Sequence, residues 1–394
     1  MNFPTVLLFC NAIEDTTRIH RCINTDSPAA SRKVFMLCEA LRLAGVKPYV
    51  ISLGRGRANG SKVFYKRSVR CVGRIPTIYA PFCHIPFLSP LLTIIGQALI
   101  ILRFVSCQNK AAIFYNRRLY YLPSLFLASL FRFNIVLDLE DGEVSLPRFK
   151  YLNRFKSSIL YRVFDKLCRN GALLACSALS SYTLARPTHC YYGISEKVTG
   201  VDRFSSDKIS VLMSGTLSVD TGAELLLETI QIIASRLPIL AKSLCFEITG
   251  MGPSLDKFSS LFNACDISNV FVHGRLSNAE YKSLLARCSV GLALKPPHGN
   301  LANTTFPSKV IEYASAGLLV ITTDISDVRM LFDDTVLYVA PNHPEILIKL
   351  LELVVNNRSD SLSRSLAGQF AVQKLCSPLQ AGNSVRDFIF GDLL

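Results

Sequence analysis

Four carboxylates stand within six residues of the sequence and form its first candidate catalytic site. The stretch Asp138-Leu139-Glu140-Asp141-Gly142-Glu143 follows an apolar run of strand length, in a half of the chain otherwise poor in acid. A carboxylate at the carboxyl end of a strand can act as general base on a hydroxyl, and crowding by like charges raises its pKa. We assign this role to Asp141, with Glu140 second. A helix N-terminal acidic cap, or a cluster that orients an acceptor, explains the stretch equally well.

The block from Thr304 to Gly317, TTFPSKVIEYASAG, is a second candidate site. Pro307 suits the first turn of a helix, whose positive N-terminal end attracts anions. Lys309 stands in the same turn, where the helix dipole disfavours a cation unless an anion is present, and Glu312 follows on a similar face. A diphosphate could bind the lysine, and ribose hydroxyls could donate to the carboxylate. A solvated Lys–Glu pair is the alternative.

Two glycine-containing turns could also hold an anion. They are Ser214-Gly215-Thr216-Leu217 and Thr249-Gly250-Met251-Gly252-Pro253, each after an apolar run of strand length. Backbone N–H groups at such turns bind anions without any side chain, and glycine allows close backbone approach. Neither turn matches the GxGxxG or P-loop pattern, so an ordinary strand-to-helix turn is the more common explanation of each alone.

The elements that must position these residues alternate in the pattern of parallel sheets with crossover helices. Strands are predicted at residues 5–10, 48–52, 111–115, 134–139 and 172–177 in the first half, and at 209–214, 244–249, 269–272, 289–294, 318–323 and 335–339 in the second. Helices are predicted in the second half at 221–236, 254–263, 277–287, 307–316 and 343–356. We therefore expect an α/β protein with two doubly wound, Rossmann-like domains facing each other across a cleft, with ligands at the carboxyl ends of both strand sets.

The domain boundaries follow from a polar segment near the middle of the chain. Residues 194–207 hold few apolar side chains and are the predicted linker. Residues 1–193 then form an N-terminal domain, and residues 208–394 a C-terminal domain whose last helix can return to the first. The length of 394 residues and the 50% apolar content fit two domains and exclude a disordered or fibrous chain.

The net charge of +14 belongs to the first half of the chain. Residues 1–200 hold 27 Lys and Arg against 10 Asp and Glu, whereas residues 201–394 hold 16 against 19. Such a charge favours an anionic partner: nucleic acid, a phosphorylated substrate or a membrane surface. A basic excess spread over solvated faces is the alternative.

Two apolar segments bear on the choice among these partners. Residues 80–102 hold no Asp, Glu, Lys or Arg, but Pro86 and Pro90 leave only 91–102 as a helix, which is too short to span a bilayer. Residues 119–133 form a similar apolar, aromatic segment. We expect both to be buried or membrane-dipping helices.

Two basic stretches, 55–74 and 148–169, lie in the same half. The second interleaves basic with aromatic residues at roughly helical spacing, which suits an anionic bilayer at about 1 kcal/mol per basic residue. RNA is less favoured because no recognisable binding module accompanies the charge. A core-facing helix with a solvated back is the other alternative.

The cysteines and the N-terminus predict the compartment. Thirteen Cys are scattered from Cys10 to Cys376 without a CxxC pair, which indicates neither a disulfide framework nor a zinc site. Buried thiols in a reducing cytosol are expected. The first residues lack the basic region and cleavage site of a signal peptide, so we expect a cytoplasmic protein.

The order of motifs in the second half resembles that of a known family. After the turn at 249–253 come Val272-His273-Gly274-Arg275-Leu276, then Cys288-Ser289-Val290-Gly291-Leu292-Ala293-Leu294, and then Phe306-Pro307-Ser308-Lys309 to Gly317. This order resembles the donor-binding domain of GT-B glycosyltransferases, especially the glycosyl transferases group 1, over about residues 209–341.

The resemblance implies a nucleotide-sugar site in the second domain. The turn after its first strand would meet the diphosphate, residues 274–276 would border the base, and Glu312 would hold the ribose. Neither a metal nor another cofactor is implied. The candidate donor-binding residues are Gly215, Thr216, Thr249, Gly250, Gly252, Gly274, Arg275, Lys295, Thr304, Thr305, Phe306, Pro307, Ser308, Lys309 and Glu312.

The sequence also departs from the family pattern. Many relatives carry an Arg and a Lys around the first turn, where this chain has Thr216 and Thr221, so Lys309 and Lys295 are the candidate cations. Relatives often show two Glu eight positions apart, and here the earlier position is Thr304. The donor sugar and the stereochemical outcome therefore stay open.

Together these features predict a peripheral glycosyltransferase of the cytosolic membrane face. It would move a sugar from a nucleotide-diphosphate donor to a lipid-linked saccharide in cell-surface polysaccharide biosynthesis, with no nucleic-acid partner. Arg32, in a helix opened by Asp26-Ser27-Pro28, could reach a phosphate on the acceptor side or lie on the surface. The alternatives are a nucleotide-sugar epimerase or hydrolase on the same architecture, and a non-enzymatic nucleic-acid or membrane-binding protein with a degenerate donor site.

Overall fold

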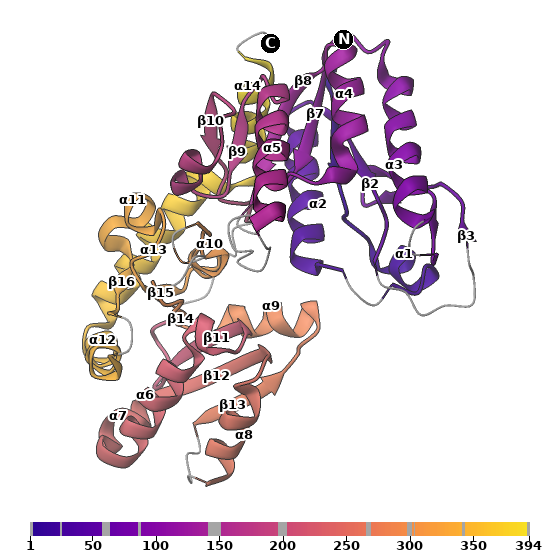
Figure 1. Ribbon diagram of the computed structural model, residues 1–394. Helices are drawn as coiled ribbons and strands as arrows, with labels where there is room; N and C mark the ends of the chain where they lie inside the picture. The colour runs from indigo at the N-terminus through magenta and orange to yellow at the C-terminus, as the bar shows by residue number, and fades with distance from the viewer. Residues whose placement is uncertain are drawn as a thin grey trace. The chain divides into compact units, whose positions relative to one another are not determined.

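The chain folds into two compact units. The computed structural model describes residues 3–23, 26–56, 64–85, 88–140, 151–195, 203–264, 269–297, 302, 304–340 and 343–391, with only the backbone at 151–158 and 261–264. The first unit comprises Met1–Ile194 together with Pro378–Leu394, and the second comprises Ser195–Ser377. In each unit helices cover a largely parallel β-sheet (Figure 1).

The first unit is built on an eight-stranded sheet with the order β10-β9-β8-β7-β1-β2-β5-β4. Neighbouring strands are parallel, except that β4 pairs antiparallel with β5 at one edge. The strands are β1 (Thr5–Cys10), β2 (Lys47–Ser52), β4 (Ser68–Val72), β5 (Ile75–Tyr79), β7 (Lys110–Tyr115), β8 (Asn134–Leu139), β9 (Ala172–Leu174) and β10 (Thr188–Cys190). A separate antiparallel pair joins β3 (Phe64–Tyr65) to β6 (Phe82–Cys83).

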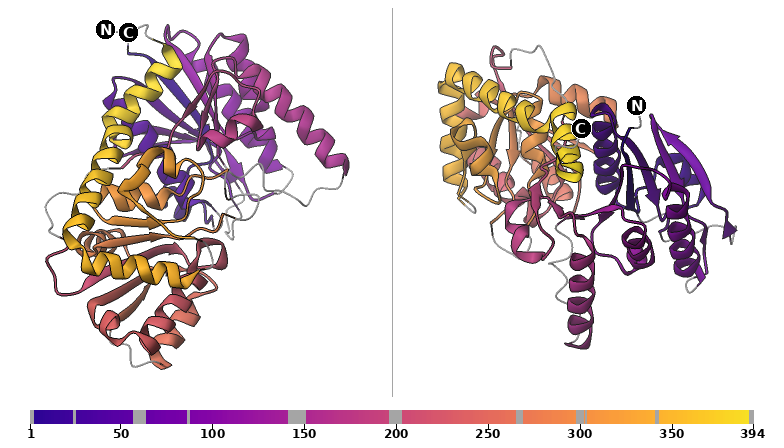
Figure 2. Two further views of the ribbon diagram at one scale, coloured as in Figure 1. Left: turned by 90° about the vertical axis from the view of Figure 1, so that its left-hand side faces the viewer. Right: turned by 90° about the horizontal axis from the view of Figure 1, so that it is seen from above.

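Helices flank both faces of this sheet. The last helix, α14 (Pro378–Phe390), lies beside α2 (Pro28–Leu43), as the yellow and indigo helices of Figure 2 show. Gly382 makes this approach possible, because a Cβ there would lie 2.1 Å from the carbonyl oxygen of Ala40. The other helical segments of the unit are α1 (Asp15–His20), α3 (Leu88–Ile101), η1 (Leu102–Phe104), η2 (Leu119–Tyr121), α4 (Leu122–Leu130), α5 (Tyr151–Leu167) and η4 (Ser177–Tyr182).

The side chains of the buried strands pack into two apolar layers, one on each face of the sheet. Val6 and Leu8 of β1 join the core formed with α2 and α14. Alternate residues of a strand point to opposite faces, so Phe9 packs on the other side, where its ring stacks on Phe114 at 4.7 Å. Phe164 of α5 meets Phe114 edge-on at 6.2 Å, which holds α5 against the sheet.

The second unit has a six-stranded, fully parallel sheet with the order β13-β12-β11-β14-β15-β16. Its strands are β11 (Ile209–Thr216), β12 (Leu244–Met251), β13 (Val270–Gly274), β14 (Val290–Ala293), β15 (Leu319–Thr322) and β16 (Leu337–Tyr338). Its helices are η5 (Val219–Thr221), α6 (Ala223–Arg236), α7 (Pro238–Ser243), α8 (Leu255–Ala264), α9 (Asn278–Arg287), α10 (Ser308–Ser315), α11 (Val328–Phe332), η6 (Asp333–Thr335), α12 (Pro344–Asn356) and α13 (Arg358–Cys376).

Arg203, in the segment predicted as a linker, is buried in the second unit. Its guanidinium donates to the carbonyl oxygens of Leu285, Ala286 and Cys288 at 2.7, 2.9 and 2.6 Å, and also to that of Ala316. These carbonyls end α9 and α10, where helix C-termini leave unsatisfied acceptors. Residues 196–202 of the predicted linker lie outside the described residues.

Several details of the first unit differ from the sequence predictions, and the short strands β3, β6 and β10 were also not predicted. The β4–β5 hairpin was not predicted: β4, which lies in the basic stretch 55–74, is mostly exposed and lacks an apolar run. The strand predicted at 172–177 ends at Leu174. The helix predicted from residue 91 begins at Leu88, with Pro90 in its first turn, where proline is tolerated. Within the described ranges no helix is long and apolar enough to cross a bilayer.

Candidate active site

Lys309 provides a cation at the carboxyl end of the second sheet. It stands in the first turn of α10, where its Nζ donates to Glu312 Oε2 at 2.5 Å and to the Tyr281 hydroxyl at 3.1 Å. The ammonium also lies 5.0 Å from the centroid of the Tyr281 ring. Lys309 Cε is 3.5 Å from the place that a Cβ would take on Gly215, so the lysine side chain runs across the end of β11.

Two tyrosines and a serine hold this pair in place. Ser214 Oγ lies 2.8 Å from the Tyr281 hydroxyl and 2.9 Å from that of Tyr313, and the Ser214 N–H donates to Tyr313 at 2.9 Å. Burial raises the pKa of Tyr313, so its phenol stays neutral and can donate. Neither tyrosine was predicted, because they reach Ser214 across 67 and 99 residues of sequence.

The two glycine turns pack tightly against each other. Gly215, Gly250 and Gly252 have φ of +116°, +137° and +154°, which L side chains rarely adopt. A Cβ on Gly250 would lie 1.8 Å from the carbonyl oxygen of Gly215, and one on Gly252 would lie 2.2 Å from that of Leu217. The close backbone approach that the sequence predicted is thus, at least in part, the approach of one turn to the other.

The other predicted donor-side residues follow the ends of neighbouring parallel strands, which meet at one edge of the sheet. Thr249 Oγ1 donates to the Gly274 carbonyl at 2.7 Å, and Lys295 Nζ donates to the Thr305 hydroxyl. Thr221 uses its hydroxyl inside the turn, donating to the Thr216 carbonyl at 2.7 Å. By exposure, Thr304 and Thr305 are buried, Phe306 and Pro307 are half-buried, and Thr216, Arg275 and Ser308 are exposed.

The start of α10 adds backbone donors to this edge. Pro307 is the N-cap rather than the first helical residue, and α10 runs from Ser308. The first N–H groups of a helix have no intrahelical acceptor, and the helix dipole places partial positive charge there. Together with the Lys309 ammonium, this end of α10 can bind an anion such as a diphosphate.

A second cluster of charges lies at the carboxyl edge of the first sheet. Lys33 of α2 donates to Asp138 Oδ1 at 2.9 Å and to a carboxylate oxygen of Glu140. The lysine ammonium also lies 5.5 Å from the ring centroid of Tyr115 and 5.3 Å from that of Tyr191. One cation therefore joins two of the four predicted carboxylates. Asp141, the first-choice base, and Glu143 lie outside the described residues.

Asp138 is the buried member of this cluster. It is 1% exposed, and its Oδ2 has no hydrogen-bond partner among the described residues. Burial raises the pKa of Asp138, an effect that Lys33 opposes and Glu140 reinforces. Lys33 was not predicted, although Arg32 beside it was. Arg32 points outward from α2 and is exposed, whereas Lys33 is half-buried.

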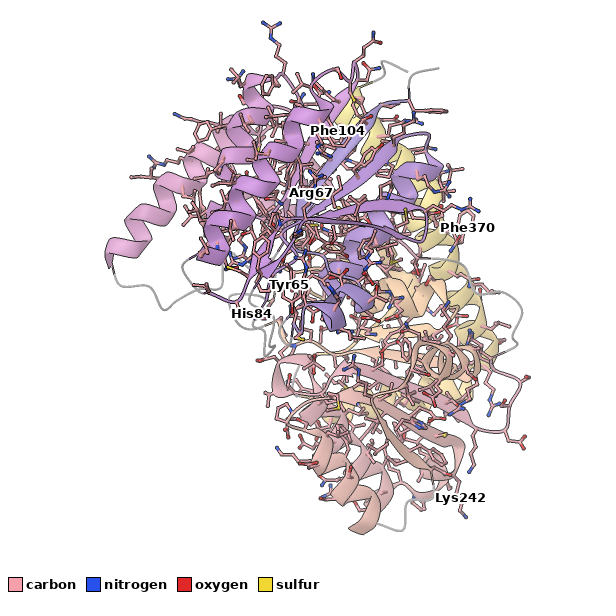
Figure 3. The ribbon with its side chains drawn as sticks, turned by 90° about the vertical axis from the view of Figure 1, so that its right-hand side faces the viewer. Tyr65, Arg67, His84, Phe104, Lys242 and Phe370 are labelled. Carbon is pink, nitrogen blue, oxygen red and sulfur yellow. The ribbon has the colours of Figure 1, made fainter. Side chains whose placement is uncertain are left out.

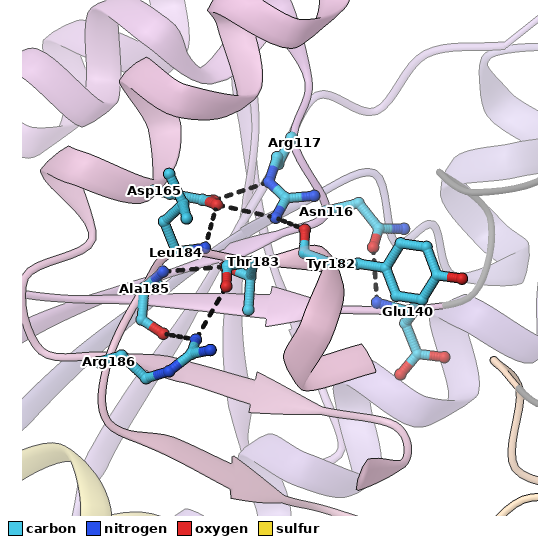
Figure 4. Close-up of polar contacts among 9 residues, drawn as sticks. All are labelled: Asn116, Arg117, Glu140, Asp165, Tyr182, Thr183, Leu184, Ala185 and Arg186. Carbon is cyan, nitrogen blue, oxygen red and sulfur yellow. Dashed lines mark hydrogen bonds and ion pairs between the residues drawn. The ribbon is translucent and has the colours of Figure 1, made fainter. Parts of the chain in front are cut away.

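Hydrogen bonds of the loop after β7 position Glu140 (Figure 4). Asn116, which follows β7 with φ of +59°, accepts the Glu140 backbone N–H at 2.8 Å. The next residue, Arg117, forms a buried ion pair with Asp165 of α5 at 2.8 Å and donates to the Tyr182 carbonyl at 2.9 Å. The network fixes the loop after β7, and with it the backbone at Glu140.

Comparison with solved structures defines the class of protein. Similar structures include sucrose-phosphate synthase from Thermosynechococcus elongatus, with TM-score 0.63, 14% identity and 98% of each chain covered. HepE from Anabaena in complex with UDP matches with TM-score 0.64 and 12% identity over 98% of this chain and 99% of that one. WaaG, a glycosyltransferase involved in lipopolysaccharide biosynthesis, matches with TM-score 0.56 and 13% identity over 98% and 100%. The fold is that of GT-B glycosyltransferases, with two Rossmann-like domains.

The match to a known family lies in the second unit. The family model of the glycosyl transferases group 1 matches residues 196–368. The second unit therefore matches this group of glycosyltransferases, as the motif order predicted. No curated protein sequence matches the chain.

Proposed function

We propose that this glycosyltransferase moves a sugar from a nucleotide-diphosphate donor to a lipid-linked saccharide at an anionic membrane surface, in the synthesis of a cell-surface polysaccharide. The single observation that carries the donor half of the proposal is Lys309, which lies across Gly215 while paired to Glu312. A cation beside a glycine turn and a helix N-terminus can bind the oxygens of a diphosphate. A carboxylate one turn later can accept hydrogen bonds from ribose hydroxyls.

The donor would rearrange the Lys309–Glu312 pair. The lysine would turn its ammonium toward the diphosphate oxygens, and a Glu312 oxygen would then accept from the ribose. Tyr281, whose hydroxyl accepts from Lys309 at 3.1 Å, would keep the ammonium at the end of β11. Because HepE has been solved with UDP and with UDP-glucose, UDP-sugars are the first donors to test.

A binding screen tests the donor site. UDP- and GDP-sugars are added to the wild type while its melting temperature is measured, and we expect one nucleotide to raise it by mass action. Lys309→Ala should abolish most of this shift and Tyr281→Phe should reduce it. Lys242→Ala changes an exposed lysine of the same unit and is the matched control (Figure 3). The donor proposal fails if no nucleotide shifts the wild type, or if Lys309→Ala behaves like Lys242→Ala.

Glu140 and Asp141 are the proposed general bases. In transfer, a carboxylate would take the proton of an acceptor hydroxyl as that oxygen bonds to the anomeric carbon and the nucleoside diphosphate leaves with its bonding electrons. Lys33 fixes the Glu140 carboxylate, and Asn116 fixes its backbone at 2.8 Å. No step requires a metal in this scheme, and Lys309 would stabilise the negative charge of the leaving group.

An exposed apolar face on the first unit supports the membrane half of the proposal. On α3 the exposed apolar residues recur at helical spacing, and α4, which packs against α3, exposes further apolar residues. The side chains of this face are 41% to 71% exposed: Leu88, Leu91, Ile95, Leu99, Leu102, Leu119, Phe126 and Leu130. Contiguous apolar patches of this kind are rare on soluble surfaces and mark interaction sites.

The charge around this apolar face is positive. Arg103, Arg118 and Arg132 are exposed and lie next to its ends. The sequence holds no Asp or Glu from residue 40 to residue 137. In the basic helix α5, Arg162 and Lys166 are exposed while Phe164 is buried, so its described part is a core-facing helix with a solvated basic back. An apolar face bordered by arginines matches an anionic bilayer surface.

Vesicle flotation tests the membrane half. The wild type should float with phosphatidylglycerol vesicles at low salt and much less with phosphatidylcholine alone. The double variant Leu91→Ser with Ile95→Ser should lose flotation. Leu366→Ser with Phe370→Ser changes an equally spaced, exposed apolar pair on α13 and should float like the wild type (Figure 3). A wild type that stays in the soluble fraction contradicts the proposal.

A further inference from the structure

The first sheet has a topological switch point at β1. From β1 the chain proceeds outward through β2 to β5, and then returns to the opposite side of β1 with β7. In doubly wound sheets, ligands bind outside the carboxyl ends of the strands at such a point. Three residues follow these strand ends: Asn11 after β1, Arg55 after β2 and Tyr120 after β7.

Both the backbone and the guanidinium of Arg55 make contacts that hold the residue in place. Asn11 Nδ2 donates to the Arg55 carbonyl at 2.8 Å, and Asn11 Oδ1 accepts the Arg55 N–H at 3.0 Å. The guanidinium carbon of Arg55 lies 4.4 Å from the centroid of the Tyr120 ring. Stacking on an aromatic ring leaves the edge of a guanidinium, with its N–H groups, available to an acceptor.

That acceptor is missing from the described residues. Arg55 Nη1 is buried without a hydrogen-bond partner, and in the part of the chain that the structure describes Arg55 belongs to no ion pair. A buried charged donor without an acceptor is costly, and native proteins seldom keep one unless a ligand or water completes it. The residue is thus preorganised for an anionic group that the described residues do not supply.

A second cation, Arg118, acts on the residue that follows Tyr120. Burial raises the pKa of Tyr121, and the charges of Arg118 and Arg55 both oppose that rise, so both guanidiniums act on this one phenol. Arg118 is exposed and directly precedes Leu119, which belongs to the apolar face. An anion held at Arg55 therefore adjoins apolar surface on one side.

We propose that Arg55, stacked on Tyr120 and assisted by Arg118, binds the phosphate oxygens that link the acceptor saccharide to its lipid. The inference rests on the proposed function and adds to it the group by which the acceptor is recognised. A guanidinium binds two phosphate oxygens with its parallel N–H donors, which an ammonium cannot do. The phosphate would lie at Arg55, and the lipid would extend over the apolar face from Leu119.

Inorganic pyrophosphate is the probe for this site. The second unit is first saturated with UDP, so that added pyrophosphate cannot report on Lys309, and pyrophosphate is then titrated by calorimetry. We expect saturable binding that Arg55→Gln weakens at least tenfold and Arg55→Lys weakens less. Arg67→Gln, an exposed arginine of the same unit, is the control and should bind like the wild type. The affinity for UDP, measured separately, should be the same in all four proteins.

Kinetics and vesicles complete the test. In transfer assays Arg55→Gln should raise the KM for the lipid-linked acceptor at least tenfold with the KM for the donor unchanged. Equal acceptor KM and equal pyrophosphate binding in Arg55→Gln and Arg67→Gln would overturn the proposal. The proposal would also be overturned if Arg55→Gln no longer floated with phosphatidylglycerol vesicles but still bound pyrophosphate. Arg55 would then bind the headgroup of a bilayer lipid and not the acceptor. If UDP does not bind the wild type, that result contradicts the proposed function. The pyrophosphate titration then still decides whether Arg55 binds an anion.

Discussion

Lys33 Nζ lies 2.9 Å from Asp138 Oδ1, and the two residues are 105 positions apart in the chain. The pair ties α2 to the end of β8 and leaves Glu140, the other partner of the lysine, at the rim. A buried carboxylate with one oxygen unpaired and the other on a lysine is stable only while that lysine stays charged. The fold of the first unit and its candidate base therefore depend on one cation.

Replacing this cation should destabilise the protein. Lys33→Met keeps the apolar stem but leaves Asp138, which is 1% exposed, without its partner. Breaking a buried pair from one side costs about 3 kcal/mol of unfolding free energy, measured by urea unfolding. Lys66→Met, at an exposed position of the same unit, should change it by less than about 0.5 kcal/mol. Equal stabilities of the two variants would contradict this account of the cluster.

The same pair gives an alkaline dependence of stability. Burial alone would lower the pKa of Lys33, but Asp138, Glu140 and Tyr115 raise it, and the result is well above 10.5. A lysine whose folded pKa exceeds its unfolded pKa contributes stability that is complete below about 10.5 and is lost as the pH rises through the folded pKa. As the pH rises from about 10.5 toward the folded pKa, the unfolding free energy of the wild type should fall more steeply than that of Lys33→Met. Parallel curves would argue against the pairing.

The glycine turns of the second unit predict a contrast between two substitutions. Gly250→Ala would put a Cβ 1.8 Å from the Gly215 carbonyl oxygen at φ of +137°, whereas Gly274→Ala, at φ of +63°, meets nothing within 4 Å. We expect losses of about 3 kcal/mol or more for Gly250→Ala and about 1 kcal/mol for Gly274→Ala. Thermal unfolding measures both. Similar losses would mean that the two turns do not pack as described.

The candidate base predicts a separation of binding from chemistry. Glu140→Gln keeps the shape of the side chain and removes its ability to accept a proton. If Glu140 is the base, kcat should fall about 100-fold or more while the affinity for the nucleotide, bound in the second unit, stays unchanged. Asp141→Asn, tested in parallel, addresses the residue that the sequence favoured. A normal kcat in both variants would exclude Glu140 and Asp141 from the proton transfer.

The sequence predicted much of the second unit because its signals are local. Helices α6, α8, α9, α10 and α12 begin and end within two residues of their predicted bounds. Ser277, for example, caps α9 in a reciprocal box with Glu280, which a four-residue pattern announces. Lys309 and Glu312 are one helical turn apart, so their pairing at 2.5 Å could be expected from spacing alone.

The contacts that long-range packing creates could not be predicted in this way. Lys33 meets Asp138 only because α2 packs beside the strand ends, and nothing local distinguishes it from Arg32. The edge strand β4 carries exposed side chains and so lacks the apolar run that marks a buried strand. In the sequence Arg55 does not differ from the other basic residues of its stretch. Only the fold brings its guanidinium carbon to 4.4 Å from the centroid of the Tyr120 ring.

The central claim is transfer of a sugar from a nucleotide donor to a lipid-linked acceptor through the Lys309 site, and an assay of transfer tests it most directly. Purified protein is incubated with a nucleotide-sugar labelled in its sugar and with a lipid extract containing lipid-linked saccharides, and the label is then partitioned between organic and aqueous phases. The account predicts label in the organic phase with the wild type and with Lys242→Ala, and a loss of at least tenfold with Lys309→Ala. Label released only as free sugar, or transferred equally by Lys309→Ala, would contradict it.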